Sequence, residues 1–238
     1  MSYYRYDGRP GFFSMLTPVV KNLIIINVII MIGTSIIGES MYEKFSLFPF
    51  ESPLFHPYQL VTHMFMHGGF WHILFNMYTL VGFGSVLERM IGEKKFLIFY
   101  FTCGLGAAAL HLGVEYLQAH SFMASVAEGS QAAAQSYIQL KSPPTVGASG
   151  AIYGVLIGYA MLFPESKLTL IFPPVTLSAK WMVIIFVAIE LVTGIGGNLV
   201  TFTDGIAHFA HLGGMLFAWL LIKYWKARGT LFNRENFS

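Results

Sequence analysis

Long apolar stretches alternate with short polar connections along the whole chain. A helix that crosses the hydrocarbon core of a bilayer needs about 20 mostly apolar residues. Six stretches of about this length occur, with the residues that end helices between them: 18–37, 70–91, 96–117, 147–163, 181–199 and 206–225. The pattern therefore predicts an all-α integral membrane protein, a bundle of six transmembrane helices.

The composition supports this interpretation. Of the 238 residues, 55% are hydrophobic and only 11% are charged, and the mean hydropathy is +0.61, far more apolar than an ordinary soluble domain. A net charge of +2, without a basic patch interleaved with aromatic residues, argues against a nucleic-acid partner. Cys103 is the only cysteine, so no internal disulfide can form.

The placement of the basic residues predicts the orientation. An even number of spans puts both termini on one side, and if that side is the cytoplasm, only Lys44 and Lys141 of the 14 Lys and Arg lie outside. This follows the positive-inside bias. We therefore expect a cytoplasmic segment 1–17 without a cleaved signal peptide, a single domain over 18–225, and a cytoplasmic tail over 226–238.

Two outer connections and the fourth span carry further information. The connection 39–69 is rich in Phe, Pro and Tyr, which suits a segment lying in the membrane interface. The connection 118–146 is rich in Ala, Ser and Gln and ends near Pro143 and Pro144, which cannot continue a helix. The fourth span, 147–163, is short, about 25 Å at 1.5 Å per residue. Its N-terminus should lie below the membrane surface, in a water-filled pocket.

Polar side chains inside spans are costly and are candidates for function. Four of them, His72, Asn76, Ser149 and His211, lie near the starts of spans two, four and six, which all run from outside to inside. We therefore expect them at a similar depth. A serine hydroxyl becomes a nucleophile when an imidazole takes its proton, and donors such as His72 and Asn76 can stabilise the oxyanion that forms.

Small residues at helical spacing indicate which spans pack closely. They are Gly150, Gly154 and Gly158 in the fourth span and Ala207, Gly214 and Ala218 in the sixth. Packing these two faces together would bring His211 to Ser149. The neighbouring His208 shares its face with bulky residues, so we predict that His211 is the base. His208 would either support the site from behind the base or contact water in the cavity.

Three motifs in this order resemble the rhomboid intramembrane serine proteases. They are HxxxN (72–76) in span two, GxSG (147–150) in span four and AHxxG (210–214) in span six. The resemblance implies the rhomboid type of six-helix bundle, with a short fourth helix and an interfacial first outer loop. One departure is Tyr58-Gln59, where the family usually carries Trp-Arg in that loop.

The resemblance also implies roles for individual residues. Ser149 and His211 would form a catalytic dyad without an acidic third member, and His72, Asn76 and the Ser149 backbone N–H would stabilise the oxyanion. In supporting roles, Gly147 would belong to the serine motif, Tyr153 would support the ring of the base and His67 would line the cavity.

The function expected from these residues is that of a serine endopeptidase cutting peptide bonds in or near transmembrane segments of other membrane proteins. Its partners would be those substrates and the lipid bilayer, and we expect neither a cofactor nor a metal. The expected location is a bacterial inner membrane, with both termini cytoplasmic. The oligomeric state is not predicted.

Other interpretations stay open. The chain could be an inactive relative that binds transmembrane helices, or a transporter, although its polar groups cluster in the outer half. His208 and His211 could share a metal ion, but there is no HExxH motif. An aspartyl mechanism needs two intramembrane Asp, and only Asp204 lies near a span. Glu190, in the middle of span five, is either a proton relay or, as we favour, a protonated or hydrogen-bonded packing contact.

Overall fold

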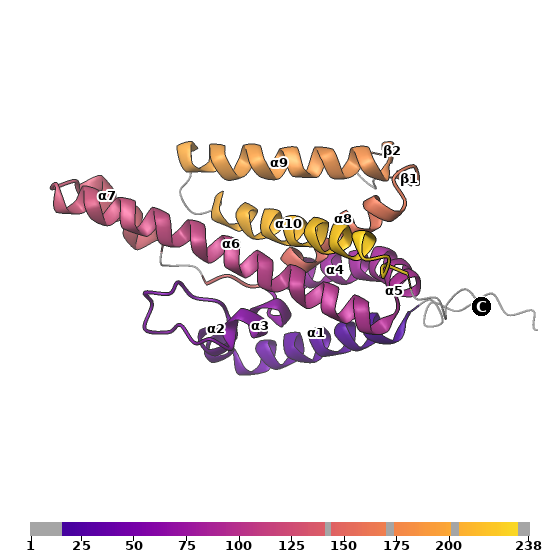
Figure 1. The fold of residues 1–238 in the computed structure, drawn as a ribbon. Coiled ribbons are helices and arrows are strands. Elements are labelled where there is room, and N and C mark those ends of the chain that lie inside the picture. The colour runs from indigo at the N-terminus through magenta and orange to yellow at the C-terminus, as the bar shows by residue number, and fades with distance from the viewer. Residues whose placement is uncertain (1–15, 141–143, 170–173, 201–204, 233–238) are drawn as a thin grey trace, which may run out of the picture.

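A computed structural model describes residues 16–140, 144–169, 174–200 and 205–232. Residues 1–15 and 233–238, which belong to the two predicted cytoplasmic segments 1–17 and 226–238, fall outside these ranges, and the proposed domain boundaries stay predictions. The described chain is mainly helical. Its long helices run side by side in one bundle (Figure 1).

Helices cover all six predicted spans. They are α1 (Pro18–Ile37), the continuous run of α4 (Phe70–Thr79), η3 (Leu80–Gly84) and α5 (Ser85–Ile91), then α6 (Glu93–Ala127), α8 (Ser149–Leu162), α9 (Ala179–Val200) and α10 (Gly205–Ala227). Among the described residues, α1, the α4–α5 run and α6 are long and apolar enough to cross a membrane, and α8 is a shorter apolar helix. The chain is thus built of membrane-spanning helices, while the count of six spans stays a prediction.

The connections hold structure that the sequence pattern did not predict. The first outer connection contains α2 (Glu39–Phe45), α3 (Gln59–Thr62) and η2 (His63–Phe65). In the second, α6 continues ten residues past its predicted end and α7 (Gln131–Leu140) turns back against it, so that the pair projects from the bundle (Figure 1). Between α8 and α9, strands β1 (Lys167–Thr169) and β2 (Thr176–Ser178) pair antiparallel, Lys167 with Ser178.

The core of the bundle lies where α6, α8 and α10 pack together. Large apolar residues fill this core, and three of them, Phe96, Phe99 and Ile222, have no exposed surface. Where the helices approach most closely, glycine replaces bulk. A Cβ on Gly154 would lie 2.6 Å from the Cβ of Cys103 on α6, so only a glycine allows this spacing.

A buried carboxylate joins the start of α1 to α5. The first N–H groups of a helix have no partner within the helix. Here the carboxylate of Glu88 accepts the backbone N–H groups of Val19 and Val20, both at 2.9 Å, and the hydroxyl of Thr17 at 2.5 Å. The charge of Glu88 is therefore hydrogen-bonded, and its sign suits the positive end of the helix dipole.

An amide side chain holds the first outer connection together. Gln59 is fully buried; its Oε1 accepts the backbone N–H of His56 at 3.1 Å, and its Nε2 donates to the carbonyl oxygens of Leu54 at 2.8 Å and Lys44 at 3.3 Å. Gln59 belongs to the pair that departs from the Trp-Arg pattern. In this chain an amide therefore ties α2 to α3.

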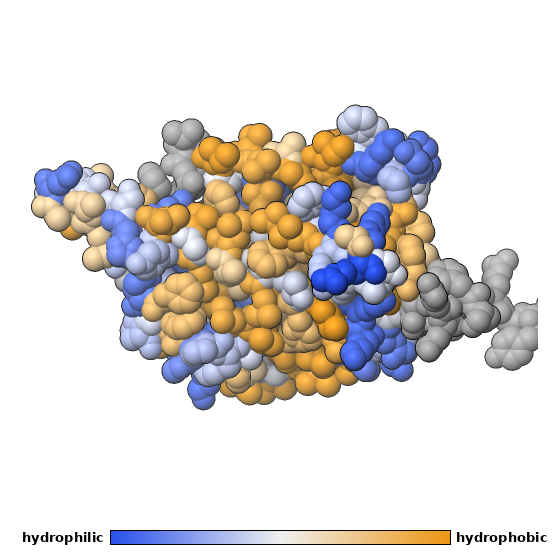
Figure 2. Space-filling model, in the orientation of Figure 1, coloured by the Kyte–Doolittle hydropathy of each residue, from blue (hydrophilic) through white to orange (hydrophobic). Residues whose placement is uncertain are grey.

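The surface divides into an apolar middle and polar ends. Figure 2 shows hydrophobic residues over the centre of the visible face and hydrophilic residues gathered towards both ends of the bundle. On α1, Ile29 is 62% exposed and Ile36 is 78% exposed, as lipid-facing side chains are. The start of α1 and the end of α10 lie at the same end of the molecule (Figure 1), where Lys95 bonds the carbonyl of Thr230. This is the surface of an integral membrane protein.

Candidate active site

The loop before α8 places Ser149 at the first position of that helix. Gly147 has φ +127°, which favours glycine, and its N–H donates to the carbonyl oxygen of His63 at 2.9 Å. A Cβ on Gly147 would lie 2.8 Å from Nε2 of His72 and 3.6 Å from Oγ of Ser149. His72 and Ser149 therefore border the same small space, and a side chain at position 147 would occupy it.

Two other elements fix the same loop. Thr145 exchanges backbone hydrogen bonds of 2.8 and 2.9 Å with Leu47, which follows α2. The hydroxyl of Thr145 also lies 2.6 Å from Nε2 of His111 on α6. The entrance to α8 is thus held from three sides, by α6, by the segment after α2 and by His63 of η2, so Ser149 has a defined position.

The hydroxyl of Ser149 and the imidazole of His211 are within hydrogen-bonding distance. Oγ lies 3.0 Å from Nε2, although the two residues are 62 positions apart in the chain. The ring of Tyr153, one turn after Ser149, stacks on the His211 ring with centroids 4.2 Å apart and planes 12° apart. Ser149, Tyr153 and His211 therefore form one packed group between α8 and α10.

Backbone contact between the two helices makes this approach possible. Gly150 and Gly214 face each other, and a Cβ on Gly214 would overlap the carbonyl oxygen of Gly150 and lie 2.7 Å from its carbonyl carbon. Ordinary carbon–carbon contacts are about 3.5–4.0 Å. The spacing of α8 and α10 beside Ser149 thus depends on the absence of a side chain at position 214.

Helix α4 supplies two potential donors to this space. His72 Nδ1 accepts the backbone N–H of Gly68 at 3.3 Å, which leaves the proton of a neutral ring on Nε2, the atom nearest Gly147. Asn76 lies one turn further along the same face of α4. Its Nδ2 is buried and has no hydrogen-bond partner among the described residues. An unpaired buried amide is unusual and marks a group available to a ligand.

His67 lies behind His72, in the connection before α4. The two ring centroids are 5.0 Å apart with the planes at 70°. Burial, with the adjacent His72 ring, lowers the pKa of His67 to about 4, so this ring is neutral at pH 7. Its Nε2 is buried and unpaired within the described part of the chain.

Glu190 of α9 is the site residue whose role the sequence interpretation missed. Its side chain is 5% exposed; Oε1 lies 3.0 Å from Nδ1 of His211 and Oε2 lies 2.5 Å from Nδ1 of His208. The available signal was an acidic residue in the middle of one span and two histidines, His208 and His211, in the next. Glu190 is hydrogen-bonded, as we favoured, but its partners belong to the site.

Among the described residues, one group of side chains could hold a metal ion: Glu190, His208 and His211. One donor atom from each lies within 4.8 Å of the others. Both carboxylate oxygens are, however, within hydrogen-bonding distance of an imidazole nitrogen. Both oxygens of Glu190 thus have hydrogen-bond partners without an ion.

A small cavity lies next to Ser149. Its volume is about 20 Å³ and its walls include Ser149, Gly147, Thr145, His63 and Ala210. This space is large enough for one water molecule, and hydroxyl and backbone groups line it. A water held there would touch Ser149.

Comparison with known proteins identifies the family. The family model described as "Rhomboid domain" matches residues 55–227. The chain belongs to the rhomboid family. The matched region contains every site residue above, so the rhomboid resemblance of the three motifs is confirmed at the level of the family.

Individual rhomboid relatives are distant. The mouse "Presenilin-associated rhomboid-like protein, mitochondrial" is 31% identical over 198 residues, covering 81% of this chain and 45% of the relative. The yeast "Rhomboid protein 1, mitochondrial" is 27% identical over 168 residues, 69% of this chain and 42% of the relative. The Arabidopsis "Rhomboid-like protein 16, chloroplastic" is 27% identical over 166 residues, 68% of this chain and 49% of the relative. The aligned part is thus less than half of each relative.

Proposed function

We propose that this protein is an intramembrane serine endopeptidase that hydrolyses peptide bonds in or near transmembrane segments through Ser149 and His211. The observation that carries the proposal is the 3.0 Å contact between Oγ of Ser149 and Nε2 of His211, within a chain of the rhomboid family. An imidazole at hydrogen-bonding distance from a hydroxyl is the arrangement that activates a serine nucleophile.

In the proposed reaction, Nε2 of His211 takes the proton of Ser149 while Oγ attacks the substrate carbonyl. The imidazolium then gives this proton to the leaving amine, and a water molecule hydrolyses the acyl-enzyme by the same route. Ser149 begins α8, so its backbone N–H has no partner within the helix. This N–H, Nε2–H of His72 and Nδ2–H of Asn76 are the proposed donors to the oxyanion.

The proposed substrates are transmembrane helices of other membrane proteins, cut near their outer ends. Ser149 starts a 14-residue helix that is about 21 Å long, shorter than the hydrocarbon core, so its N-terminus lies below the surface if the helix spans inward. A helical substrate hides its carbonyl groups in hydrogen bonds. Glycine and other helix-weakening residues at the cleavage point should therefore favour hydrolysis.

Localisation and topology belong to the same proposal. The charge split supports cytoplasmic termini, and a bacterial inner membrane remains our proposal for the compartment. The relatives above are named as mitochondrial or chloroplastic proteins, which does not match that compartment. Fractionation of the native cells with antibody against the chain decides between a plasma membrane and an organelle.

The decisive experiment combines labelling and cleavage. Purified protein in detergent is treated with a fluorophosphonate probe, and a transmembrane substrate with an Ala/Gly-containing segment is incubated with it in parallel. Wild type should label and cleave, whereas Ser149→Ala should do neither. A protein that folds but does not label would be a binder of transmembrane helices or a transporter instead.

A second pair of variants assigns the base. His211→Ala should lose essentially all hydrolysis and labelling, because Nε2 of His211 is the group within hydrogen-bonding distance of the Ser149 hydroxyl, whereas His208 faces Glu190. His208→Ala should keep measurable activity. An active His211→Ala beside a folded but inactive His208→Ala would refute the assignment.

A further inference from the structure

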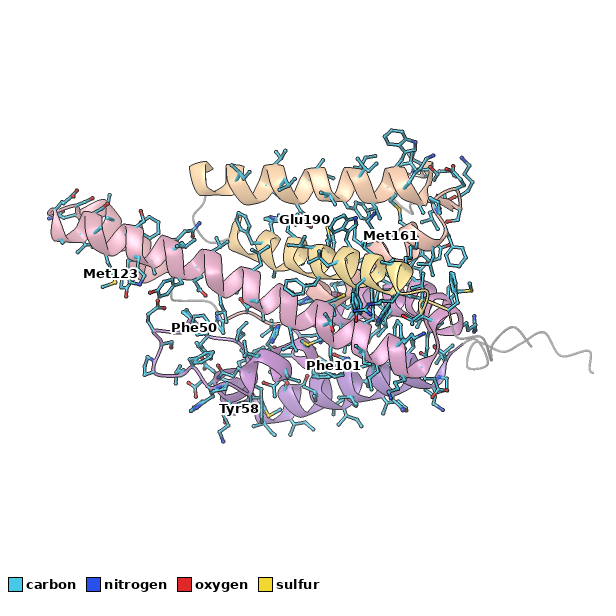
Figure 3. The ribbon with its side chains drawn as sticks, in the orientation of Figure 1. Phe50, Tyr58, Phe101, Met123, Met161 and Glu190 are labelled. Atoms are coloured by element: carbon cyan, nitrogen blue, oxygen red, sulfur yellow. The ribbon has the colours of Figure 1, made fainter. Side chains whose placement is uncertain are left out.

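A buried carboxylate lies within the apolar middle of α9. Glu190 is the only acidic residue of that helix, and its side chain is 5% exposed. An ionised group in such surroundings is destabilising unless it is fully hydrogen-bonded. Glu190 lies between α9 and α10 (Figure 3), so its partners come from the helices of the site.

Three donors converge on the two carboxylate oxygens. Nδ1 of His211 lies 3.0 Å from Oε1, Nδ1 of His208 lies 2.5 Å from Oε2, and the hydroxyl of Tyr153 is a further hydrogen-bond partner. An ionised carboxylate can only accept, and its two oxygens offer about four lone pairs. The arrangement is satisfied when Glu190 is ionised and each histidine carries a proton on Nδ1.

This pattern sets the protonation of His211. A neutral imidazole with its proton on Nδ1 has a bare Nε2, which is the atom 3.0 Å from Oγ of Ser149. Nε2 can then accept the serine proton. The opposite tautomer would place a proton between Nε2 and Oγ and could not act as a base.

We propose that Glu190 is a positioning residue for His211: it holds the reactive tautomer and ring orientation, and its negative charge stabilises the imidazolium that forms during the reaction. This inference rests on the proposed function above and replaces the expected dyad with a Ser149–His211–Glu190 chain of contacts. His208 holds the second oxygen of Glu190 and so keeps the carboxylate directed at His211.

The proton balance needs no additional reactant. The Oγ–H bond of Ser149 breaks, a bond from Oγ to the substrate carbonyl carbon forms, and Nε2 of His211 gains the proton. Glu190 stays ionised throughout and faces the positive imidazolium. When the C–N bond of the substrate breaks, the proton passes from Nε2 to the leaving amine, and His211 returns to the neutral form.

A purely structural role is the competing explanation, because the same hydrogen bonds tie α9 to α10. The two roles differ in what a charge-only change should do. Glu190→Gln keeps the size of the side chain and one acceptor oxygen but removes the charge. If Glu190 only holds α9 against α10, the variant should have a lower Tm, and the folded molecules should keep the wild-type kcat and KM. If Glu190 positions His211, kcat of the folded molecules should change.

We therefore expect Glu190→Gln to lower kcat by about 10² or more, within the loss of up to about 10⁴ known for soluble triads, with KM changed by less than about threefold. The acidic limb of its pH–kcat/KM profile should move to lower pH, because the imidazolium has lost its anionic partner. Among the described residues, the titratable groups that face Glu190 are His208 and His211 on α10 and Tyr153 on α8, and His72 faces His211. None of them is altered by the substitution.

Two further variants complete the test. Glu190→Asp keeps the charge at a shorter reach, so it should recover part of the kcat and the wild-type acidic limb. Glu165→Gln is the matched control, since Glu165 is 72% exposed, pairs with Lys180 and lies outside the site. It should behave as wild type.

The outcomes separate the two proposals. Wild-type cleavage that is abolished in Ser149→Ala establishes the proposed function whatever Glu190 does. Given that result, a Glu190→Gln variant with kcat within threefold of wild type and an unmoved acidic limb overturns the role of Glu190. If Glu190→Gln does not fold, a Glu190→Asp variant with the acidic limb displaced to lower pH overturns it as well. If wild type neither cleaves nor labels, both proposals fall.

Discussion

Substitution of Gly214 by alanine tests the central geometric claim, that backbone contact between α8 and α10 sets the distance between Ser149 and His211. The added Cβ would lie 2.7 Å from the carbonyl carbon of Gly150 and closer still to its oxygen. An ordinary contact needs about 3.5–4.0 Å. The two helices must therefore separate by about 1 Å at this point, because the opposing atoms belong to the backbone and cannot rotate away.

This separation acts directly on the reacting groups. Gly150 follows Ser149 in α8, and Gly214 lies one turn after His211 in α10. A shift of about 1 Å lengthens the 3.0 Å contact between Oγ and Nε2 to about 4 Å, beyond a hydrogen bond. Misplacement by 1 Å can lower a rate by about 10². We expect kcat of Gly214→Ala to fall by about that factor, which is about 2.7 kcal/mol in the barrier.

The assay is cleavage of a transmembrane substrate in detergent together with the rate of fluorophosphonate labelling. A misplaced base slows labelling of every molecule, whereas partial unfolding lowers the final amount of label and leaves the rate unchanged. Gly113→Ala is the matched control, because Gly113 is also on a helix and a Cβ there meets nothing within 4 Å. Wild-type labelling and cleavage rates in Gly214→Ala would refute the argument that this contact sets the active geometry.

Four further predictions concern single positions in the chain. Asn76→Ala should lower kcat by about 10²–10³ with little change in KM, because it removes a proposed oxyanion donor. If kcat is instead unchanged and KM is raised, Asn76 is a substrate-binding group. Gln59→Ala should lower the free energy of unfolding by about 1–3 kcal/mol, because it removes three hydrogen bonds made by a fully buried amide. The same change at the exposed Gln131 should not, and thermal melts in detergent measure both. Burial lowers the pKa of His63 from 6.5 to about 4, so between these pH values the unfolded chain binds a proton that the folded chain does not. The Tm should therefore fall as the pH drops from about 6.5 to 4, and it should fall less in His63→Gln. A single cysteine at position 131 in a Cys103→Ser background should react with an impermeant thiol reagent from the outside only; labelling from the cytoplasmic side alone would reverse the topology.

Features that depend on local pattern could be predicted from the residues alone. An apolar run of helical length must form its hydrogen bonds internally in a bilayer, so its ends can be located from hydropathy, and α1 and the α4–α5 run begin and end at the predicted residues. The motifs around His72, Ser149 and His211 were enough to identify the rhomboid family, because they occur in the right order on the right helices.

Which polar groups contact one another could not be predicted in this way. Hydropathy does not distinguish an acid that faces lipid from one that faces a neighbouring helix, so the contacts of Glu190 with His208 and His211 depend on how α9 is rotated against α10. The bonds of Gln59 likewise join α2 and α3, whose mutual placement no local pattern specifies. The α6–α7 hairpin formed in a connection rich in Ala and Gln, where helix propensity is high but no apolar stripe was expected. For Glu190 and for the bond from Gln59 to α2, the deciding term is a contact between separate helices, which exists only once those helices have packed.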